Sequence, residues 1–301
     1  MRWWGLGLLG MHLGCVDGAW EAQVALIDKP QVVAVIAEPA ELRPGEQVQL
    51  TAVVAEPVGQ GLDVADVGPW TFCTTARSVG SAASVAEACR TEFGVPLAER
   101  ALQVQATVPE DACSLFGPEP PGGDLRPQDP DSTGGYYQPV RLSAFGSLWL
   151  YFVRVRCALA DAPTAIAKAY AQRYAANRNP ALTALQVGEV TLAPEELVGE
   201  VTIEVAGEQT LALHAVLAAD AAETYVWFDS EQRTLVERQE SLEVRWFVNG
   251  GELTVNGQGA QIGEARWQLP AEGQLQLWVV LADDRGGMMA GSLQVRLTPG
   301  A

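Results

Sequence analysis

The sequence of 301 residues is short of basic residues, of histidine and of long apolar runs. Lys and Arg number 19 against 37 Asp and Glu, which gives a formal net charge of −18. A chain this acidic repels phosphate backbones, and it has no basic patch, so we expect no nucleic-acid partner. The surplus of acid is typical of a surface that resists self-association, and an acidic binding surface is the alternative interpretation.

The common motifs of catalysis are also absent. The sequence has no Gly-x-Ser-x-Gly, no P-loop, no Gly-x-Gly-x-x-Gly on a strand–helix unit and no His-Glu-x-x-His. His214 lies in an alternating strand and has no nucleophile motif to accompany it, which favours a surface position over a catalytic base. Carboxylates far apart in sequence can form a glycosidase site, but among 37 acids such pairs have no specificity. We therefore expect a non-enzymatic protein without a cofactor.

The N-terminus has the pattern of an export signal. Arg2 precedes an apolar stretch over residues 3–13 that only His12 interrupts. This stretch is shorter than the roughly 20 residues that a membrane-spanning helix needs, but it fits the apolar region of a secretory signal. The usual small-x-small cleavage site is missing, and Cys15 stands where a bacterial lipoprotein signal would be cut.

Leu13-Gly14-Cys15 resembles a lipobox, in which the cysteine is lipidated and becomes the first mature residue. His12 departs from the leucine that normally stands three residues before the cysteine. The interpretation is a lipoprotein signal peptide at 1–14 and a tether at 15–29, and Val16 favours the outer membrane over the inner one. A plain secreted protein and a wrongly assigned start codon are the alternatives.

Cysteine usage also indicates export. With Cys15 lipidated, an even number of cysteines remains for pairing in an oxidising compartment: Cys73, Cys89, Cys113 and Cys157. Of three connectivities we favour Cys73–Cys89 and Cys113–Cys157, because nearest-neighbour closure is simplest. Closing a loop of about 15 residues contributes on the order of 3 kcal/mol in the chain-entropy model. The spacings are too long for a zinc site, so no metal is expected there.

A pattern that occurs twice indicates the fold. Residues 31–55 and 181–218 each contain an apolar extended segment, a Gly-Glu-Gln turn (Gly45 and Gly207 begin the two turns) and an alternating strand. Alternation with a period of two predicts half-buried antiparallel strands. The predicted fold class is therefore all-β, with two tandem Ig-like β-sandwiches at 30–160 and 180–301 that a helical connector at 161–179 joins.

Several local expectations follow from this fold. Trp70 and Trp246 lie in strand registers that suit core aromatics. A helix is expected over residues 162–176, and Pro180 prevents its continuation. Asn249-Gly250-Gly251 predicts a tight hairpin turn between two strands.

The segment 116–139 holds six prolines and five glycines in 24 residues, so it is expected to be a long loop. Long loops on sandwiches often carry binding residues. The candidates here are two kinds of side chain, acids and exposed aromatics: Asp124, Asp129, Asp131, Tyr136 and Tyr137. Calcium needs six to eight oxygens, more than this acid pattern supplies. A calcium loop, a partner-binding loop and a plain connector remain alternatives.

Several segments resemble an uncharacterised family of predicted lipoproteins from myxobacteria and related delta-proteobacteria with bacterial Ig-like folds. They include WTFC at 70–73, DPDSTGGYYQPVR at 129–141, RYAANRNPALTAL at 173–185 and WVVLADDRGG at 278–287. The resemblance implies an exported, lipid-anchored envelope protein and implies no activity. We expect a binding or structural role toward a protein or glycan, with membrane contact through the anchor only. A calcium-dependent or acidic-residue hydrolase acting on an extracellular glycan or protein is the alternative.

Overall fold

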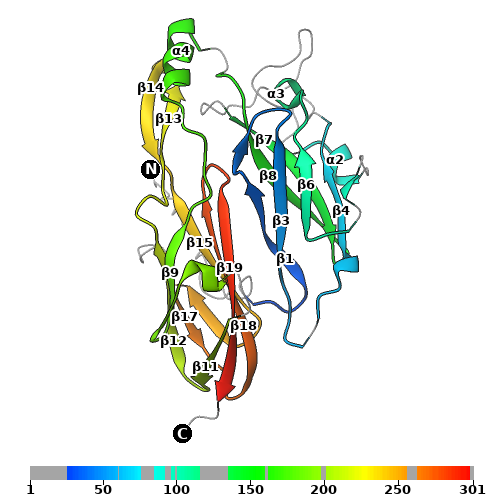
Figure 1. Cartoon of the computed structure of the whole chain (residues 1–301), viewed down its shortest axis with the longest axis vertical. Coiled ribbons are helices and arrows are strands. Elements are labelled where there is room, and N and C mark those ends of the chain that lie inside the picture. The colour runs from blue at the N-terminus through cyan, green and yellow to red at the C-terminus, as the bar shows by residue number, and fades with distance from the viewer. Residues whose placement is uncertain are drawn as a thin grey trace, which may run out of the picture.

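The computed structural model describes residues 26–59, 61–75, 85–91, 96–98, 100–115, 135–159, 162–197, 201–255 and 263–298. These residues form two β-sandwiches that lie side by side, with a projecting hairpin and one longer helix beside them (Figure 1). Cys15 and the predicted signal peptide lie outside the described residues. No helix in the described part combines the length and the apolar character needed to cross a bilayer.

The first sandwich consists of a three-stranded and a five-stranded sheet. The three-stranded sheet has the order β1 (Gln31–Glu38), β3 (Gln47–Ala55), β6 (Gln103–Thr107). The five-stranded sheet has the order β2 (Glu41–Leu42), β8 (Ser147–Arg156), β7 (Gly135–Ala144), β4 (Val67–Phe72), β5 (Pro96–Ala98). Short helices connect some of these strands: η1 (Val64–Asp66), α2 (Ala88–Thr91) and α3 (Ala112–Leu115).

The second sandwich repeats this plan with a five-stranded and a four-stranded sheet. The first sheet has the order β10 (Val190–Leu192), β9 (Leu182–Val187), β12 (Thr210–Leu217), β17 (Glu264–Gln268), β16 (Glu252–Val255). The second has the order β11 (Thr202–Ala206), β19 (Met288–Thr298), β18 (Gly273–Asp283), β15 (Leu242–Val248), and the short helix η2 (Pro194–Leu197) precedes β11.

The strand order defines both units as Ig-like. In each unit the first, second and fifth core strands share one sheet, and the third, sixth and seventh share the other, as in immunoglobulin domains. The first strand also continues across to the opposite sheet, where β2 runs parallel to β8 and β11 runs parallel to β19. The all-β prediction of two Ig-like sandwiches is confirmed.

The two Gly-Glu-Gln turns occupy equivalent places but differ in backbone geometry. Each leads into the central strand of its three-strand core, β3 in the first unit and β12 in the second. The left-handed residue is Gly45 (φ 80°) in the first turn and Glu208 (φ 59°) in the second. Gly207 has no room for a side chain, because a Cβ there would collide with the carbonyl of Ala271. The repeated sequence pattern therefore corresponds to equivalent strands in the two units, although the turns before these strands differ in conformation.

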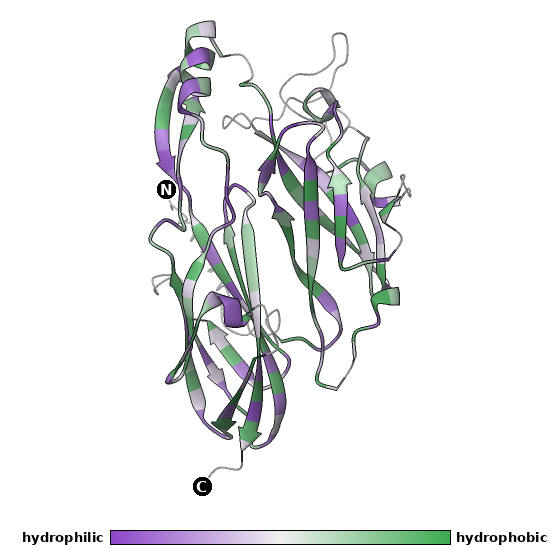
Figure 2. Ribbon diagram, in the orientation of Figure 1, coloured by the Kyte–Doolittle hydropathy of each residue, from purple (hydrophilic) through white to green (hydrophobic). Residues whose placement is uncertain are grey.

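Each sandwich has an aromatic residue at the centre of its core. Trp70 is fully buried in the first, and its indole N–H donates to the carbonyl of Ala101 at 2.7 Å. Trp267 is fully buried in the second and donates to Gly250 at 2.8 Å. Trp246 is also buried, as its register predicted. Hydrophobic and hydrophilic stretches alternate along the strands of both units, as Figure 2 shows, because each sheet buries one face.

A third apolar cluster lies between the sandwiches. Its buried residues come from four segments: Ile27 before β1, Val33 and Ala34 in β1, Ala55 in β3, and Trp278 and Val280 in β18. Strand β18 is buried on both faces, since Leu277, Val279 and Leu281 point into the second core. This explains the continuous apolar run WVVLA in a strand that would otherwise alternate. The run is the sequence signal of a domain interface.

The fold begins before Pro30, earlier than the sequence suggested. Ile27 is buried, and its N–H donates to the carbonyl of Val248 at 2.8 Å, while Leu26 forms a parallel bridge to the same residue. The last residues of the expected tether at 15–29 therefore belong to the domain interface. An apolar pair next to Asp28 and Lys29 is too short a pattern to have indicated this.

The helical connector is shorter than expected and packs on the second unit. Helix α4 spans Thr164–Arg173 and contacts a hairpin of β13 (Thr224–Asp229) and β14 (Thr234–Gln239). This hairpin is inserted before β15 and stands with α4 above the second sandwich in Figure 1. Residues 174–179 have no regular secondary structure and form the actual connection between the two sandwiches.

Candidate functional site: the domain junction

The four cysteines in the described residues form two disulfides. Cys73 bonds to Cys89 and Cys113 bonds to Cys157, the pairing that the sequence favoured, with Cα–Cα distances of 5.3 and 5.7 Å. The first ties α2 to the end of β4, and the second ties α3 to the end of β8. Both disulfides lie in the first sandwich and serve its structure.

The aromatic candidates of the Pro/Gly loop are not exposed, and this part of the prediction is wrong. Tyr136 and Tyr137 lie in β7, and only 6% of Tyr136 is accessible. Tyr137 is partly covered, and its hydroxyl accepts a hydrogen bond from Arg154 at 3.2 Å. The glycines before them suggested a loop, but the strand already starts at Gly135. Asp124, Asp129 and Asp131 lie outside the described residues. The possible calcium loop that they would form therefore stays a prediction.

A buried ion pair marks the polar half of the domain junction. Arg154 of β8 and Glu41 of β2 are neighbours in register, and Arg154 Nε lies 3.0 Å from Glu41 Oε2. Their side chains are 0% and 1% accessible. Gly135 makes this possible, because a Cβ at that position would collide with the Arg154 guanidinium. An ion pair this deeply buried needs further hydrogen bonds to offset its desolvation.

The linker between the sandwiches supplies those hydrogen bonds. The Tyr174 hydroxyl donates to Glu41 Oε1, and the Asn177 N–H donates to Glu41 Oε2 at 3.0 Å. Asn179 bridges the two units, since its amide donates to Ala37 of β1 and accepts from the N–H of Met288 in β19, both at 2.9 Å. The residues 174–179 are therefore held by both sandwiches.

Arg285, in the turn between β18 and β19, connects the second sandwich to this cluster. Its side chain is 2% accessible. Nη1 lies 3.1 Å from Glu240 Oε1 and Nη2 lies 3.4 Å from Glu41 Oε2. Nη2 also donates to the carbonyl of Ala175 at 3.1 Å. One guanidinium thus contacts an acid of each sandwich and the linker between them.

Two carboxyls of the cluster have altered acidity. Burial raises the pKa of Glu240 to about 7, although the N–H of Glu223 and the charge of Arg285 stabilise its ionised form. Burial also raises the pKa of Asp283, which accepts hydrogen bonds from the N–H groups of Gly287 and Arg285. Gly287 must lack a side chain, because a Cβ would collide with Asp283 Oδ2.

Sequence reasoning missed this junction cluster, which we define as Glu41, Arg154, Glu223, Glu240, Asp283 and Arg285. In the sequence, residues 283–287 contribute only to a family resemblance, and the segment 177–180 indicates only the end of a helix at Pro180. Two signals were present: two asparagines without a capping role in the linker, and an arginine in a two-aspartate turn. Both indicate buried polar partners, but not which ones.

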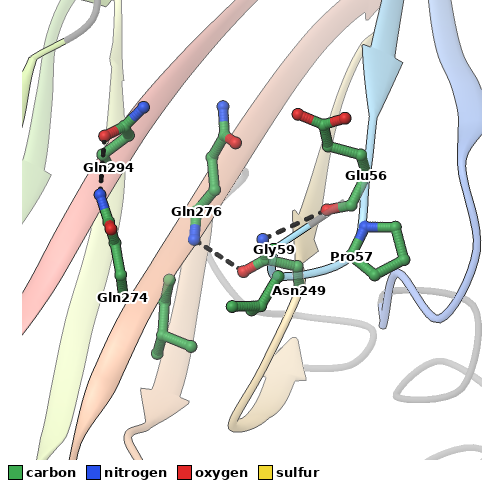
Figure 3. Close-up of a pocket in the computed structure, with 9 residues that line it drawn as sticks. Glu56, Pro57, Gly59, Asn249, Gln274, Gln276 and Gln294 are labelled. Atoms are coloured by element: carbon green, nitrogen blue, oxygen red, sulfur yellow. Dashed lines mark hydrogen bonds between the residues drawn. The ribbon is translucent and has the colours of Figure 1, made fainter. Parts of the chain in front are cut away.

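A small cavity of about 150 Å³ opens between the sandwiches at the other end of their interface. It is lined by the segment 56–59 and by Asn249, Gln274, Gln276 and Gln294 (Figure 3). Asn249 donates to the carbonyl of Glu56 at 3.2 Å and accepts from the N–H of Gln276 at 2.7 Å. The expected hairpin turn at Asn249 is therefore wrong, because β15 and β16 belong to different sheets and Asn249 joins β18 instead.

The chemistry of the junction is structural. The described residues contain no group of three or more His, Cys, Asp or Glu side chains arranged to hold a metal ion. The carboxylates of the junction cluster face arginines and backbone N–H groups instead. His214 lies apart on β12 with its ring nitrogen 3.3 Å from Gln186 Oε1, as expected for a strand surface. The arrangement can hold two domains together and can exchange a proton.

No protein-family model and no curated protein matches the chain. Among solved structures, fibronectin(III)-like modules of Clostridium thermocellum CbhA align over 89% of this chain and 94% of theirs, at 10% identity and a TM-score of 0.25. The Ig1-2 module of the Drosophila receptor protein tyrosine phosphatase DLAR aligns over 90% and 99%, at 9% identity and a TM-score of 0.24. TM-scores this low carry no argument, so the Ig-like assignment depends on the strand order described above. Ig-like sandwiches are suited to binding or structural roles, which they perform through strand edges and loops.

Proposed function

We propose that the protein is an exported, lipid-anchored protein of the bacterial envelope whose two Ig-like domains act as one binding or structural module. The observation that carries the module role is the junction, where an apolar cluster and a buried ionic cluster hold both sandwiches. Two domains held in this way present a fixed surface to a partner, which lowers the entropy that binding costs.

Export is supported by the disulfides and by the N-terminal sequence. Paired cysteines persist in oxidising compartments, and both pairs close in the first sandwich. The lipobox-like Leu13-Gly14-Cys15 supplies the anchor in this proposal, and the outer membrane is its proposed location. The partner is a protein or glycan outside the cytoplasm, and the proposed role involves no catalysis.

The test compares the wild type with Cys15→Ser in a bacterium that processes lipoproteins, by intact mass and membrane fractionation. We expect a chain that starts at Cys15, carries the added mass of lipid and fractionates with the membrane, and we expect the variant to lose both properties. A Cys73→Ser variant is the matched control, because it removes a different cysteine and should keep the lipid. An unmodified product that fractionates identically from wild type and Cys15→Ser would contradict the anchor.

A further inference from the structure

Arg285 is shared between two acids that belong to different sandwiches. Glu240, in the connection between β14 and β15, belongs to the second unit, and Glu41 of β2 belongs to the first. The guanidinium is 0.3 Å closer to Glu240 (3.1 Å) than to Glu41 (3.4 Å). Since Arg285 makes the ionic contact between the units, whatever weakens its attraction to Glu240 leaves it more strongly bound to Glu41.

The charges around Arg285 do not balance when all acids are ionised. The junction cluster holds four carboxylates against two arginines. Arg178 adds a third cation from the solvent side, where it lies 2.5 Å from Glu223. One carboxylate therefore has no cation of its own, and a buried surplus charge is costly.

Glu240 is the acid that can take up the missing proton. Its side chain is 0% accessible. The groups that face it from the surrounding elements are Glu223 and Tyr225 at β13, Asp283 at the end of β18, Arg285 in the next turn and Arg178 in the linker. Burial is the main cause that raises the pKa of Glu240 to about 7, and the charges of the two acids Asp283 and Glu223 raise it further.

We propose that the domain junction is a pH-responsive latch, in which Arg285 binds Glu41 of the first sandwich more strongly when Glu240 is protonated and is drawn back to Glu240 when that carboxyl ionises. Opening the junction takes Glu41 away from Arg285 and leaves the guanidinium to Glu240 alone, which favours the ionised carboxylate. The open state therefore releases the proton at a lower pH than the closed state does. Acidification closes the latch and neutral or alkaline conditions loosen it.

The sign follows from linkage. The pKa of Glu240 is about 7 in the closed state and lower in the open state, where Arg285 pairs with Glu240 alone, so between the two values the closed state keeps a proton that the open state has lost. The ratio of closed to open molecules is highest at acid pH, below the open-state pKa, and falls by up to about tenfold per pH unit toward pH 7. Above pH 7 both states are ionised and the ratio is constant at its lowest value.

Hydrogen exchange of two amides at the junction, one in the linker and one at the start of β19, measures this ratio. The N–H of Asn177 bonds to Glu41 and the N–H of Met288 bonds to Asn179, so both are protected only while the junction is closed. Exchange is measured on the full chain at pH 5, 6, 7 and 8 and divided by the intrinsic rate at each pH. Amides of β17 in the second core provide the internal reference for global unfolding.

We expect the protection of these two amides to fall from pH 5 to pH 7 relative to β17, by up to about fortyfold, and to change by no more than about twofold above pH 7. Glu240→Gln keeps the shape but cannot ionise, so its protection should stay high and independent of pH. Glu237→Gln is the matched control, because Glu237 lies on β14 outside the cluster and pairs only with Arg173 of α4 among the described contacts. It should follow the wild type.

Wild-type protection that is flat between pH 5 and pH 8 overturns the proposal, and it does so even if Glu240→Gln does not fold. A Glu240→Gln variant that folds and keeps the wild-type pH profile overturns it as well, since another group would then control the junction. The proposal does not depend on export or lipidation, because it concerns only the contacts between the two sandwiches.

Discussion

The two sandwiches share one strand order but are stabilised in different ways. The first has a three-stranded sheet opposite its larger sheet, and two disulfides attach short helices to the ends of β4 and β8. The second extends the equivalent sheet to five strands with β10 and β16, and its described residues include no cysteine. Its core contains the two large indoles of Trp246 and Trp267.

The difference indicates how an Ig-like core tolerates irregular connections. In the second sandwich, the hydrogen-bonded edge strands β10 and β16 extend the sheet, and apolar packing stabilises the unit without disulfides among the described residues. In the first sandwich, short helices stand at the ends of the strands, and the disulfides stabilise the unit by restricting the unfolded chain. The junction then joins a disulfide-linked unit to one that depends on packing, so each unit can be perturbed separately.

The largest expected effect, about 7 kcal/mol, comes from removing both disulfides together. Replacing Cys73 and Cys89 with alanine should destabilise the first sandwich by about 3 kcal/mol, and replacing Cys113 and Cys157 by about 4 kcal/mol, since they close loops of 16 and 44 residues. Denaturant unfolding, followed by hydrogen exchange of core amides in each sandwich, would measure the two losses. A reductant should destabilise the wild type as much as removing both disulfides does, and it should not change the stability of the variant that lacks all four cysteines. Because the junction couples the two units, the second sandwich should also unfold at a lower denaturant concentration. Loss confined to the first sandwich would indicate that the two units unfold independently.

Trp278→Ala should cost about 3–5 kcal/mol, because it empties the apolar half of the junction. The loss concerns contacts between the units, so we expect calorimetry to resolve two transitions that the junction otherwise couples. Trp227→Ala is the control, because Trp227 lies on the hairpin, where Arg238 stacks 3.5 Å from its ring centroid. It should leave the coupling unchanged. A single transition in Trp278→Ala would mean that the ionic half alone couples the domains.

A smaller effect separates two buried tryptophans of the second core. Trp267→Phe leaves the carbonyl of Gly250 without its indole donor and should cost about 1–3 kcal/mol beyond the lost volume. Among the described residues, the indole N–H of Trp246 has no hydrogen-bond partner. Trp246→Phe removes an unsatisfied group and should cost less. Urea unfolding of the two variants tests this, and the reverse order of stability would contradict it.

The smallest expected effects are at the hydroxyls of the junction. Tyr174→Phe loses a hydrogen bond to Glu41, the carboxyl paired with Arg154, and should cost about 1.5–3 kcal/mol. Tyr137→Phe loses a hydrogen bond from Arg154, which also donates to Glu41, and should cost about 1 kcal/mol. Thermal unfolding at fixed pH would compare the pair. If Tyr137→Phe were the more damaging, Arg154 would depend on this hydroxyl more than on Glu41.

Much of the fold could be predicted because its signals are local. Alternation in residues 47–55 and 210–217, the apolar run of β18 and the Pro and Gly turns mark strands and their ends within a few residues. Errors arose where a local pattern has two structural meanings. Asn249-Gly250-Gly251 suits a hairpin and also a crossing between sheets, and the tyrosines after a glycine-rich segment suit a loop and also a buried strand start.

The candidate site could not be predicted, because its members come from distant positions. Glu41, Arg154, Glu240 and Arg285 span most of the chain, and each alone resembles one of many surface charges. The lipid anchor at Cys15 and the binding role of the loop acids remain sequence predictions, since these residues lie outside the described part of the chain.

By itself the sequence determined the two Ig-like units and favoured the pairing of the four cysteines, because strand alternation and loop closure are properties of neighbouring residues. Only the tertiary structure decided that the sandwiches lie side by side and that one arginine is shared between them. The physical reason is burial: the two faces that meet at Trp278 and the charges that surround Arg285 acquire their partners only when both sandwiches have formed.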